Sequence, residues 1–297
     1  MSQQQANAPL FTLKNVGPNV WAVIEPGGLS NSGFVVGDDG VVVIDTFVTV
    51  DAVGAFSLQA AQQILAEIRK VTSLPVRFVV NTHYHLDHVS GNSVFVDAGA
   101  KVIAQRNVRE WMQTETFRLF GNQIKPEQKA FIEALPPPVV TYDEGITIHL
   151  GSRAVQVRSF PGHTGSDSIV VVPDAKTVFT GDLFWRNTLP NLMDGSIKSW
   201  LDTVHRLETE FRDYTFIPGH GDVGDVKDVA AFHEYLVTLH RLVSEAQAGG
   251  QTGTTLAEAV VPQLQRKYGE WGFFNIFAQP NILDIDAELR GTERVPQ

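Results

Sequence analysis

The run Asn81-Thr-His-Tyr-His-Leu-Asp-His-Val-Ser-Gly-Asn92 places three histidines and one aspartate within six residues. It follows an apolar segment whose valines and phenylalanine are typical of a buried strand. His83 and His85 are two residues apart, so they project to the same side of an extended backbone and can share one metal ion. Asp87 and His88 lie on the turn that follows, where a second ion fits within about 4 Å of the first. This density of ligands indicates a metal site rather than a polar surface turn.

Three later segments repeat one pattern, in which an apolar strand ends, a glycine follows, and a metal-ligating side chain comes next. They are Pro161-Gly-His163, Thr180-Gly-Asp182 and Pro218-Gly-His220. Glycine lets the backbone turn sharply, and strand ends are where α/β proteins tend to place their sites. Each segment alone is a common structural turn. As a set in this order, they add His163, Asp182 and His220 to the candidate ligands.

The order of these candidate ligands along the chain resembles that of the metallo-β-lactamase superfamily of hydrolases. The resemblance extends from about residue 20 to about residue 224, and the first histidine run is its most specific part. It implies an α/β fold, the four-layer αββα sandwich, with a dinuclear metal site at one edge. It also implies a role for each residue: His83, His85 and His163 bind the first metal, Asp87, His88 and His220 bind the second, and Asp182 bridges both.

The resemblance implies two Zn²⁺ per chain, with iron or manganese as alternative metals. The sequence has no cysteine, so His, Asp, Glu and water must supply every ligand, which suits these ions. Two cations that flank one water lower its pKa to about 7, and the metal-bound hydroxide can attack an ester, thioester, lactone or amide-type bond of a small molecule. Asp87 and Asp182 are the candidate catalytic residues, and Asp87 can also relay a proton to the leaving group. Four neighbouring side chains are candidates to hydrogen-bond the ligands: Thr82, Thr164, Ser166 and Asp167.

The substrate has several interpretations within this family. An ester, thioester or lactone is the first, because the antibiotic-degrading groups usually carry Cys or Ser where this chain has Asp182. Hydrolysis of β-lactams is the second interpretation. A glyoxalase II-like thioesterase would bind glutathione through basic residues, and here only Arg266 and Lys267 are suggestive.

Other functional classes fit the sequence less well. A persulfide dioxygenase-like oxidoreductase would hold a single iron at the equivalents of His83, His163 and Asp182, which leaves the second set of ligands unexplained. The formal net charge of −10 argues against an RNA-processing nuclease, because Lys and Arg usually supply affinity for nucleic acids. A non-catalytic binding module is the least favoured, because no ligand position has been lost.

Composition sets the remaining expectations. The chain has 297 residues, of which 43% are hydrophobic and 19% charged, as in a globular protein with a sizeable core. Its first ten residues are polar and unlike a secretory signal, and no apolar run approaches the roughly 18 residues of a membrane span. We therefore expect no nucleic-acid or membrane partner and a cytoplasmic location, or a periplasmic one if a signal segment has been removed. The sequence does not indicate an oligomeric state.

Apolar runs separated by turn signals predict two blocks of strands and helices. Short β-branched runs predict strands at residues 20–24, 32–36, 41–44, 76–80, 101–104, 146–149, 154–157, 168–172, 177–180 and 214–217. Helical periodicity predicts helices at residues 55–71, 107–119, 126–135, 196–211, 226–248 and 255–268. Pro136-Pro-Pro138 separates the blocks, so we expect two sheets packed face to face with helices outside. We expect one domain, 1–297, in which residues 250–297 form a helical and aromatic extension.

A few further residues carry weaker expectations. His205 and His233 lie on expected helices, where a surface or packing role is the usual one. Several aromatic side chains lie close to the candidate ligands in the sequence or in the flanking helical segments. They are Phe184 and Trp185 shortly after Asp182, Trp111, Phe117 and Phe120 on the helix before the proline break, and Trp271, Phe273, Phe274 and Phe277 in the extension. We expect these aromatic side chains to line a substrate pocket.

Overall fold

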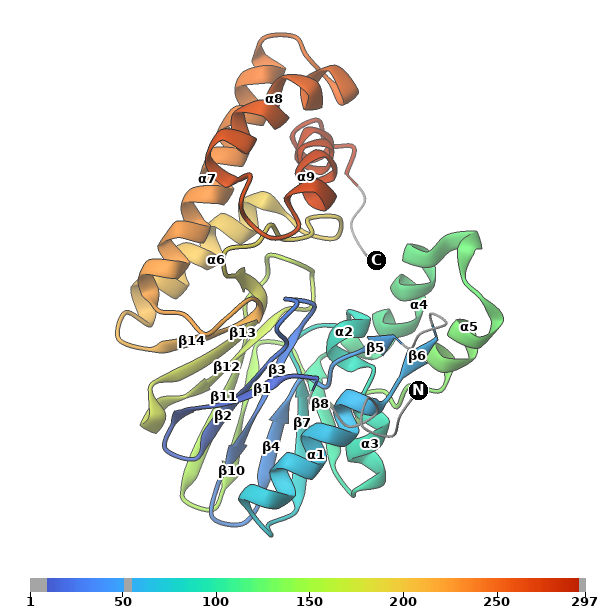
Figure 1. Ribbon diagram of the computed structural model, residues 1–297, viewed down its shortest axis with the longest axis vertical. Helices are drawn as coiled ribbons and strands as arrows, with labels where there is room; N and C mark the ends of the chain where they lie inside the picture. The colour runs from blue at the N-terminus through green and yellow to red at the C-terminus, as the bar shows by residue number, and fades with distance from the viewer. Residues whose placement is uncertain (1–9, 51–54, 294–297) are drawn as a thin grey trace, which may run out of the picture.

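A computed structural model describes residues 10–50 and 55–293 of the chain. Two β-sheets pack face to face, and helices cover the outer faces of both sheets (Figure 1). The predicted four-layer sandwich is confirmed. Residues 1–9 lie outside the described part of the chain. The helix predicted from residue 55 begins only at Gln59, because Phe56 and Ser57 instead pair with Val50 and Thr49 as a short strand.

The first sheet has seven strands in the order β1-β2-β3-β4-β7-β8-β9. They are β1 (Thr12–Gly17), β2 (Val20–Ile24), β3 (Asn31–Val36), β4 (Val41–Ile44), β7 (Val76–Asn81), β8 (Lys101–Gln105) and β9 (Val140–Tyr142). The first four pair antiparallel, and β4, β7, β8 and β9 pair parallel. Between β4 and β7 the chain passes through β5 (Thr49–Val50), β6 (Phe56–Ser57) and α1 (Gln59–Val71). Helix α1 covers the outer face of this sheet with buried side chains that include Ile64 and Ile68.

The second sheet has five strands in the order β10-β11-β12-β13-β14. They are β10 (Gly145–Leu150), β11 (Arg153–Ser159), β12 (Ser168–Val172), β13 (Thr177–Trp185) and β14 (Thr215–His220). All pairs are antiparallel except β13 with β14, which are joined by α6 (Ile197–Glu210) and run parallel. Helices α6 and α7 (Val226–Ala248) lie on the outer side of this sheet (Figure 1).

The core between the sheets consists of aliphatic side chains from both inner faces. Val35 and Val42 of the first sheet meet Val155 and Val170 of the second, and all four are fully buried. Burying one valine side chain contributes about 1.5–3 kcal/mol to folding, so the β-branched runs supply both the strand propensity and the core. This packing brings the ends of β7, β13 and β14 to one edge of the sandwich (Figure 1).

The C-terminal part of the chain forms a helical layer that projects beyond the sandwich (Figure 1). It contains α8 (Gly253–Tyr268), which was predicted, and α9 (Phe274–Leu289), which was not. Because α9 carries apolar side chains around most of its circumference, it has no amphipathic period that a sequence pattern could show. Leu239 of α7, Leu256 of α8 and Ile282 of α9 share one core with α6 and β13. The assignment of residues 1–297 to one domain, with 250–297 as its extension, stays a prediction.

The other predicted elements are present, with ends that differ by a few residues. The helices of the first block are α4 (Val108–Phe120) and α5 (Pro126–Glu133), preceded by the short α2 (Leu86–Val89) and α3 (Asn92–Asp97). The proline break does not separate the two sheets, because Val139 donates a backbone hydrogen bond to Val102 at 2.9 Å and β9 then joins the first sheet. The boundary lies instead between β9 and β10. None of the described helices is both long and apolar enough to cross a membrane.

Candidate metal centre

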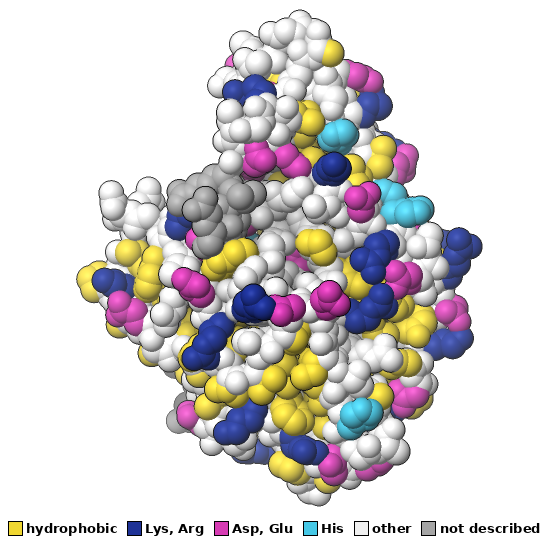
Figure 2. Space-filling view, turned by 180° about the vertical axis from the view of Figure 1, so that it is seen from behind, with side chains coloured by type: hydrophobic (Ala, Val, Ile, Leu, Met, Phe, Trp, Pro, Cys, Tyr) yellow, Lys and Arg dark blue, Asp and Glu magenta, His cyan; other side chains and the backbone are white. Residues whose placement is uncertain are grey.

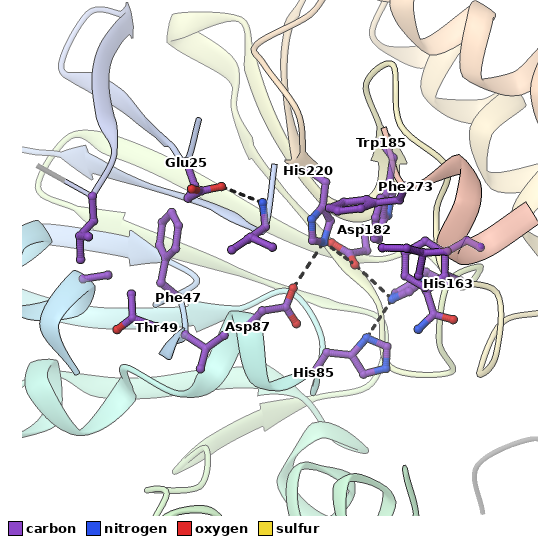
Figure 3. Close-up of a pocket in the computed structure, with 17 residues that line it drawn as sticks. Glu25, Phe47, Thr49, His85, Asp87, His163, Asp182, Trp185, His220 and Phe273 are labelled. Atoms are coloured by element: carbon purple, nitrogen blue, oxygen red, sulfur yellow. Dashed lines mark hydrogen bonds and ion pairs between the residues drawn. The ribbon is translucent and has the colours of Figure 1, made fainter. Parts of the chain in front are cut away.

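Five segments of the chain bring the candidate ligands to the edge of the sandwich where β7, β13 and β14 end. His83 and His85 follow β7, and Asp87 and His88 lie on the short helix α2. The others come from the second sheet: His163 from the loop after β11, Asp182 from within β13, and His220 from the end of β14. Figure 3 shows the side chains of His85, Asp87, His163, Asp182 and His220 converging from these elements. The structure thus brings together every ligand that the sequence predicts.

Two glycines let the strand ends approach closely enough for this convergence. Gly181 has a positive φ of 50°, and a Cβ there would lie 2.5 Å from the Oγ1 of Thr82. A Cβ at Gly219 would lie only 1.9 Å from the Oδ1 of Asp182. Gly181 and Gly219 therefore make room for a neighbouring ligand segment, in addition to turning the backbone.

The first ligand group consists of His83, His85, His163 and Asp182, whose donor atoms lie within 4.8 Å of one another. The Nε2 of His163 lies 3.0 Å from the Nδ1 of His85 and 3.2 Å from the Oδ2 of Asp182. The Nε2 of His83 lies 3.8 Å from the same carboxylate oxygen. Three ring nitrogens and one carboxylate oxygen therefore face a common point.

The second ligand group consists of Asp87, His88, His220 and again Asp182. The Nε2 of His88 lies 3.0 Å from the Oδ1 of Asp182 and 3.2 Å from the Oδ2 of Asp87. The Nε2 of His220 lies 3.2 Å from the Oδ2 of Asp182 and 3.4 Å from the Oδ2 of Asp87. Asp182 belongs to both groups, so it occupies the position of a bridging ligand.

Unpaired buried atoms show that these groups fit cations. The Nε2 atoms of His83 and His88 and the Oδ1 of Asp182 are buried, and none of them makes a hydrogen bond of acceptable geometry, although His88 Nε2 and Asp182 Oδ1 are only 3.0 Å apart. Buried polar atoms are normally paired, and these three atoms point into the two ligand groups. A cation in each group would satisfy them, and a donor set of imidazole nitrogen and carboxylate oxygen suits zinc, iron or manganese.

Each of the five histidines also uses its second ring nitrogen. The partners are Thr82 Oγ1 for His83 at 3.1 Å, Asp194 Oδ2 for His85 at 3.3 Å, Asp45 Oδ2 for His88 at 2.8 Å, the Asn191 carbonyl for His163 at 3.0 Å and the Gly28 carbonyl for His220 at 2.8 Å. Such outer contacts fix the orientation of each ring and hence the nitrogen that faces inward. In His85 this inward nitrogen is Nδ1, whereas in the other four histidines it is Nε2.

The four outer side chains that the sequence proposed have different roles. Thr82 alone contacts a ligand ring, that of His83. Thr164, Ser166 and Asp167 instead hydrogen-bond one another and the backbone of the turn that carries His163. Asp167 Oδ2, for example, accepts from the backbone nitrogens of Gly162 at 3.0 Å and Thr164 at 2.7 Å. These three residues shape the loop rather than the ligand.

Sequence reasoning missed two carboxylates, Asp45 and Asp194. Asp45 directly follows β4 at the edge where the ligands gather, which is a signal that the sequence contains. Asp194 lies 109 positions after His85 in an irregular loop, and no local pattern marks it. Asp194 also accepts hydrogen bonds from Tyr84 and Arg118, so it links α4 to the His85 ring.

The charges of the two groups differ. Burial lowers the pKa of His83 well below its usual range and that of His163 to about 3, so both rings are neutral at pH 7. Burial alone would also lower the pKa of His220, but the carboxylates of Asp182 and Asp87 outweigh it and raise that pKa to about 9. In the same way Asp87, Asp182 and Asp45 raise the pKa of His88. Without a cation, the second group therefore holds its carboxylates with protonated histidines.

Comparison with known proteins now identifies the family. The profile of the metallo-beta-lactamase superfamily matches residues 26–220, which is more than half of the chain. The chain belongs to the metallo-beta-lactamase superfamily. The family membership that the histidine run indicated is thus confirmed.

Curated relatives in this superfamily include enzymes with different names. The chain is 24% identical over 205 residues to a linear primary-alkylsulfatase of a Pseudomonas species, which covers 59% of this chain and 35% of the relative. It is 29% identical over 174 residues to a hydroxyacylglutathione hydrolase of Brucella ovis, which covers 58% of this chain and 56% of the relative. The match thus spans from about a third to just over half of the length of these relatives.

Solved structures share the fold. A metallo-beta-lactamase from Pontibacter korlensis matches with a TM-score of 0.60 at 22% identity, over 76% of this chain and 98% of that one. An inverting sec-alkylsulfatase from a Pseudomonas species matches with a TM-score of 0.69 at 18% identity, over 94% of this chain and 50% of that one. At these identities the likeness shows the fold alone.

This superfamily member has a cavity of about 560 Å³ beside the ligands. Its wall includes the side chains of five candidate ligands, His85, Asp87, His163, Asp182 and His220. The Trp185 ring stacks on the His220 ring with centroids 3.6 Å apart and an angle of 21° between the planes. Trp185, Phe273 and Phe277 line the cavity, as predicted. The other aromatic side chains expected there are not among its lining residues: Trp111, Phe117, Phe120, Phe184, Trp271 and Phe274.

A third group of metal-ligating side chains lies outside the cavity. His205 and Glu208 on α6 meet His233 on α7, and the Nδ1 of His233 lies 3.0 Å from a carboxylate oxygen of Glu208. His205 is two-thirds exposed. This group is separate from the centre described above and has no cavity of its own among those found in the described residues.

Proposed function

We propose that this protein is a dinuclear, zinc-dependent hydrolase that cleaves an ester, thioester, lactone or amide-type bond of a small molecule. The observation that carries this proposal is the convergence of two ligand groups on one shared carboxylate, with buried inward atoms that lack a hydrogen-bond partner. We assign the first metal to His83, His85, His163 and Asp182, and the second to Asp87, His88, His220 and Asp182. The opening of the cavity onto both groups gives a small molecule access to them.

The residues of the centre have separate tasks in such a reaction. When bound, the two cations would lower the pKa of a water to about 7 and polarise the bond to be cleaved. Asp182 contacts both ligand groups, so its carboxylate fixes their separation. Asp87 lines the cavity with its side chain 26% exposed, and its Oδ2 can accept a proton and pass it to a leaving group. We therefore propose Asp87 and Asp182 as the catalytic residues.

The metal and the reaction class have alternatives that the geometry weighs unequally. Iron or manganese would accept the same nitrogen and oxygen donors as zinc. An oxidoreductase with a single iron would need only His83, His163 and Asp182. The close approach of His88 and His220 to Asp87 supports a second metal and hence the hydrolase.

A sulfate ester is a second candidate substrate. Two of the similar proteins are named alkylsulfatases, and the cavity combines metal ligands with an apolar wall. Hydrolysis of β-lactams ranks lower, because the carboxylate of a β-lactam would meet no Lys or Arg among the described residues that line the cavity. Both sulfate and carboxylic esters are therefore included in the test below.

The surface supports a small-molecule substrate over a nucleic acid. On the face shown in Figure 2, Lys and Arg side chains are interspersed with Asp and Glu. Many Lys and Arg side chains of the described residues are paired with carboxylates, as Arg158 and Arg206 are with Glu210. An electrostatic footprint for a polyanion would instead need a continuous basic patch. The cytoplasmic location stays a prediction.

Metal analysis and a substrate panel test the proposal together. Purified protein is expected to hold two zinc ions per chain in the centre and to hydrolyse at least one member of a panel of carboxylic ester, thioester, lactone, β-lactam, sulfate ester and phosphodiester substrates. His85→Ala should lose metal and activity, whereas His233→Ala, which removes a histidine outside the cavity, should keep the activity of the wild type. One iron per chain with oxygen consumption would contradict the proposal.

A further inference from the structure

The cavity beside the metal centre is divided into a polar and an apolar part. Of the 17 residues that line it, five are ligands and nine are apolar, so the wall away from the ligands is mostly hydrocarbon. Six of the nine apolar residues come from three separate places: Leu29 before β3, Phe47 and Val48 after β4, and Phe273, Ile276 and Phe277 at the start of α9. Segments far apart in the sequence have thus contributed apolar side chains to one wall.

The charge of this wall is also informative. No Lys or Arg occurs among the described residues that line the cavity, and the one carboxylate besides the ligands is Glu25. Glu25 Oε2 accepts a hydrogen bond from the backbone nitrogen of Leu29 at 2.8 Å (Figure 3). A negatively charged group placed here, away from the metal ligands, would meet no cation and would be repelled by Glu25.

Two wall residues have a backbone conformation that bulky side chains rarely adopt. Phe47 has a φ of 63° and Phe273 a φ of 59°, both in the left-handed region. Conformations of this kind cluster at ligand sites, where the surrounding structure holds them. In this chain the two positions place phenylalanine side chains in the cavity wall from two different layers: Phe47 from the segment after β4 of the first sheet, and Phe273 from the start of α9 in the C-terminal helical layer.

The rim of the cavity is apolar as well. Leu29 is 62% exposed and Ile276 is 58% exposed, which makes them two of the most exposed large hydrophobic side chains of the described chain. Exposed apolar side chains that are contiguous with an apolar cavity mark a binding surface for an apolar group. They extend the hydrocarbon wall from the ligands to the protein surface.

We propose that the substrate is an amphiphile, in which the bond to be cleaved lies at the metal ligands and an uncharged alkyl or aryl chain lies along Leu29, Phe47, Ile276 and Phe277. This proposal rests on the proposed hydrolase function and narrows its substrate class. It excludes the glutathione moiety, with its two carboxylates, as a preferred group, because the basic residues suggested for it, Arg266 and Lys267, do not line the cavity. Lys267 instead pairs with Glu234 at 2.5 Å on the surface of α7 and α8. The same alkyl or aryl group could belong to a carboxylic ester or to an alkyl sulfate.

A chain-length series on the metal-loaded protein tests the substrate class. One arm uses p-nitrophenyl acyl esters with 2 to about 12 carbons, and the other uses alkyl sulfates of the same lengths. In the productive arm, kcat/KM is expected to rise about two- to fourfold for each added methylene until the cavity is filled. An acyl thioester of a neutral thiol should react faster than the same acyl thioester of glutathione. A flat chain-length profile, or a preference for glutathione, would overturn the proposal while leaving the hydrolase function intact.

Two matched variants test where the alkyl group of the substrate binds. Ile276→Asp places a charge on the cavity rim, so kcat/KM for the longest reactive substrate should fall at least tenfold, and that for the two-carbon ester far less. Val237→Asp makes the same change at a 45% exposed position of α7 outside the cavity and should leave the whole profile unchanged. If kcat/KM depends on chain length in the same way in both variants, the part of the rim formed by α9 does not contact the substrate.

A binding measurement separates this proposal from the proposed function. Binding of n-alkyl phosphonates, which are not hydrolysed, is followed by the fluorescence change of the wild-type protein and of Ile276→Asp. If no substrate is hydrolysed but the Kd falls steadily with alkyl length, the hydrolase function is wrong and the apolar site stands. If hydrolysis proceeds and the Kd is independent of alkyl length, the apolar site is wrong.

Discussion

The carboxylate of Asp45 lies 2.8 Å from the Nδ1 of His88, on the side of the ring opposite to the metal centre. The same carboxylate accepts hydrogen bonds from the backbone nitrogen and the hydroxyl of Thr82, at 2.8 and 2.7 Å. Thr82 in turn contacts the ring of His83. One buried aspartate therefore orients a histidine of each ligand group, although it belongs to neither.

We expect Asp45→Asn to weaken the second metal more than the first. The amide keeps the size of the side chain and tolerates the positive φ of 55° at this position, but it removes the charge that orients His88. Loss of an outer carboxylate typically lowers metal affinity by about 10- to 100-fold. Competition with a chromogenic chelator measures the loss, and Asp39→Asn, at an exposed pair with Arg77, is the control. Unchanged affinity for both ions would show that Asp45 serves only the fold.

The two ions should also differ in the protons that they displace. At pH 7 the raised pKa values of His88 and His220, the latter about 9, keep both rings protonated in the metal-free protein, whereas His83 and His163 are neutral. A ligand must lose its proton to bind, so the second ion should release about two protons and its affinity should rise with pH up to about 9. The first ion should release fewer. Calorimetric titration in buffers of different ionisation enthalpy counts these protons, and equal counts for the two ions would contradict the assignment.

The sequence predicted the centre better than its surroundings. His83 to His88 lie in one run, and the Gly-His and Gly-Asp turns mark the other ligands, because ligands at strand ends leave a local pattern. Asp194 has no such pattern, since its partner His85 is 109 positions away and only the folded loop after β13 brings them together. Helix α9 was missed for a related reason. Its apolar side chains serve both the core and the cavity, so no single face is polar.

Asp194 should stabilise the metal-free protein in a pH-dependent way. Burial would raise the pKa of its carboxyl group, but His85, Tyr84 and Arg118 outweigh burial and lower it to about 2. Because this pKa is depressed in the folded state, the stabilisation is present above the unfolded value of about 4 and is lost as the pH falls towards 2. At pH 7, Asp194→Asn should lower the free energy of unfolding by about 2 kcal/mol.

Urea unfolding of the metal-free protein at several pH values measures this effect. The difference between wild type and Asp194→Asn should be largest near pH 7 and should shrink between pH 4 and pH 2. Asp202→Asn, at an exposed position of α6, serves as the control and should unfold like the wild type throughout. A difference that does not depend on pH would mean that Asp194 acts through packing rather than through its charge.

The substitution Gly219→Ala, which adds a single methyl group, is the strictest test of the close approach of β14 to β13. An alanine Cβ there would lie 1.9 Å from the Oδ1 of Asp182 and 2.8 Å from the backbone carbon of Gly181, so either the bridging carboxylate or the β13 backbone must move. Overpacking of this kind costs about 1–3 kcal/mol of stability. Since Asp182 belongs to both ligand groups, Gly219→Ala should lose both ions, not one. Gly249→Ala, at the end of α7, adds the same methyl group where the nearest atom is 3.3 Å away, and it should keep both ions. If Gly219→Ala retains one ion tightly, Asp182 does not bridge the two groups, and each group must be a metal site in its own right.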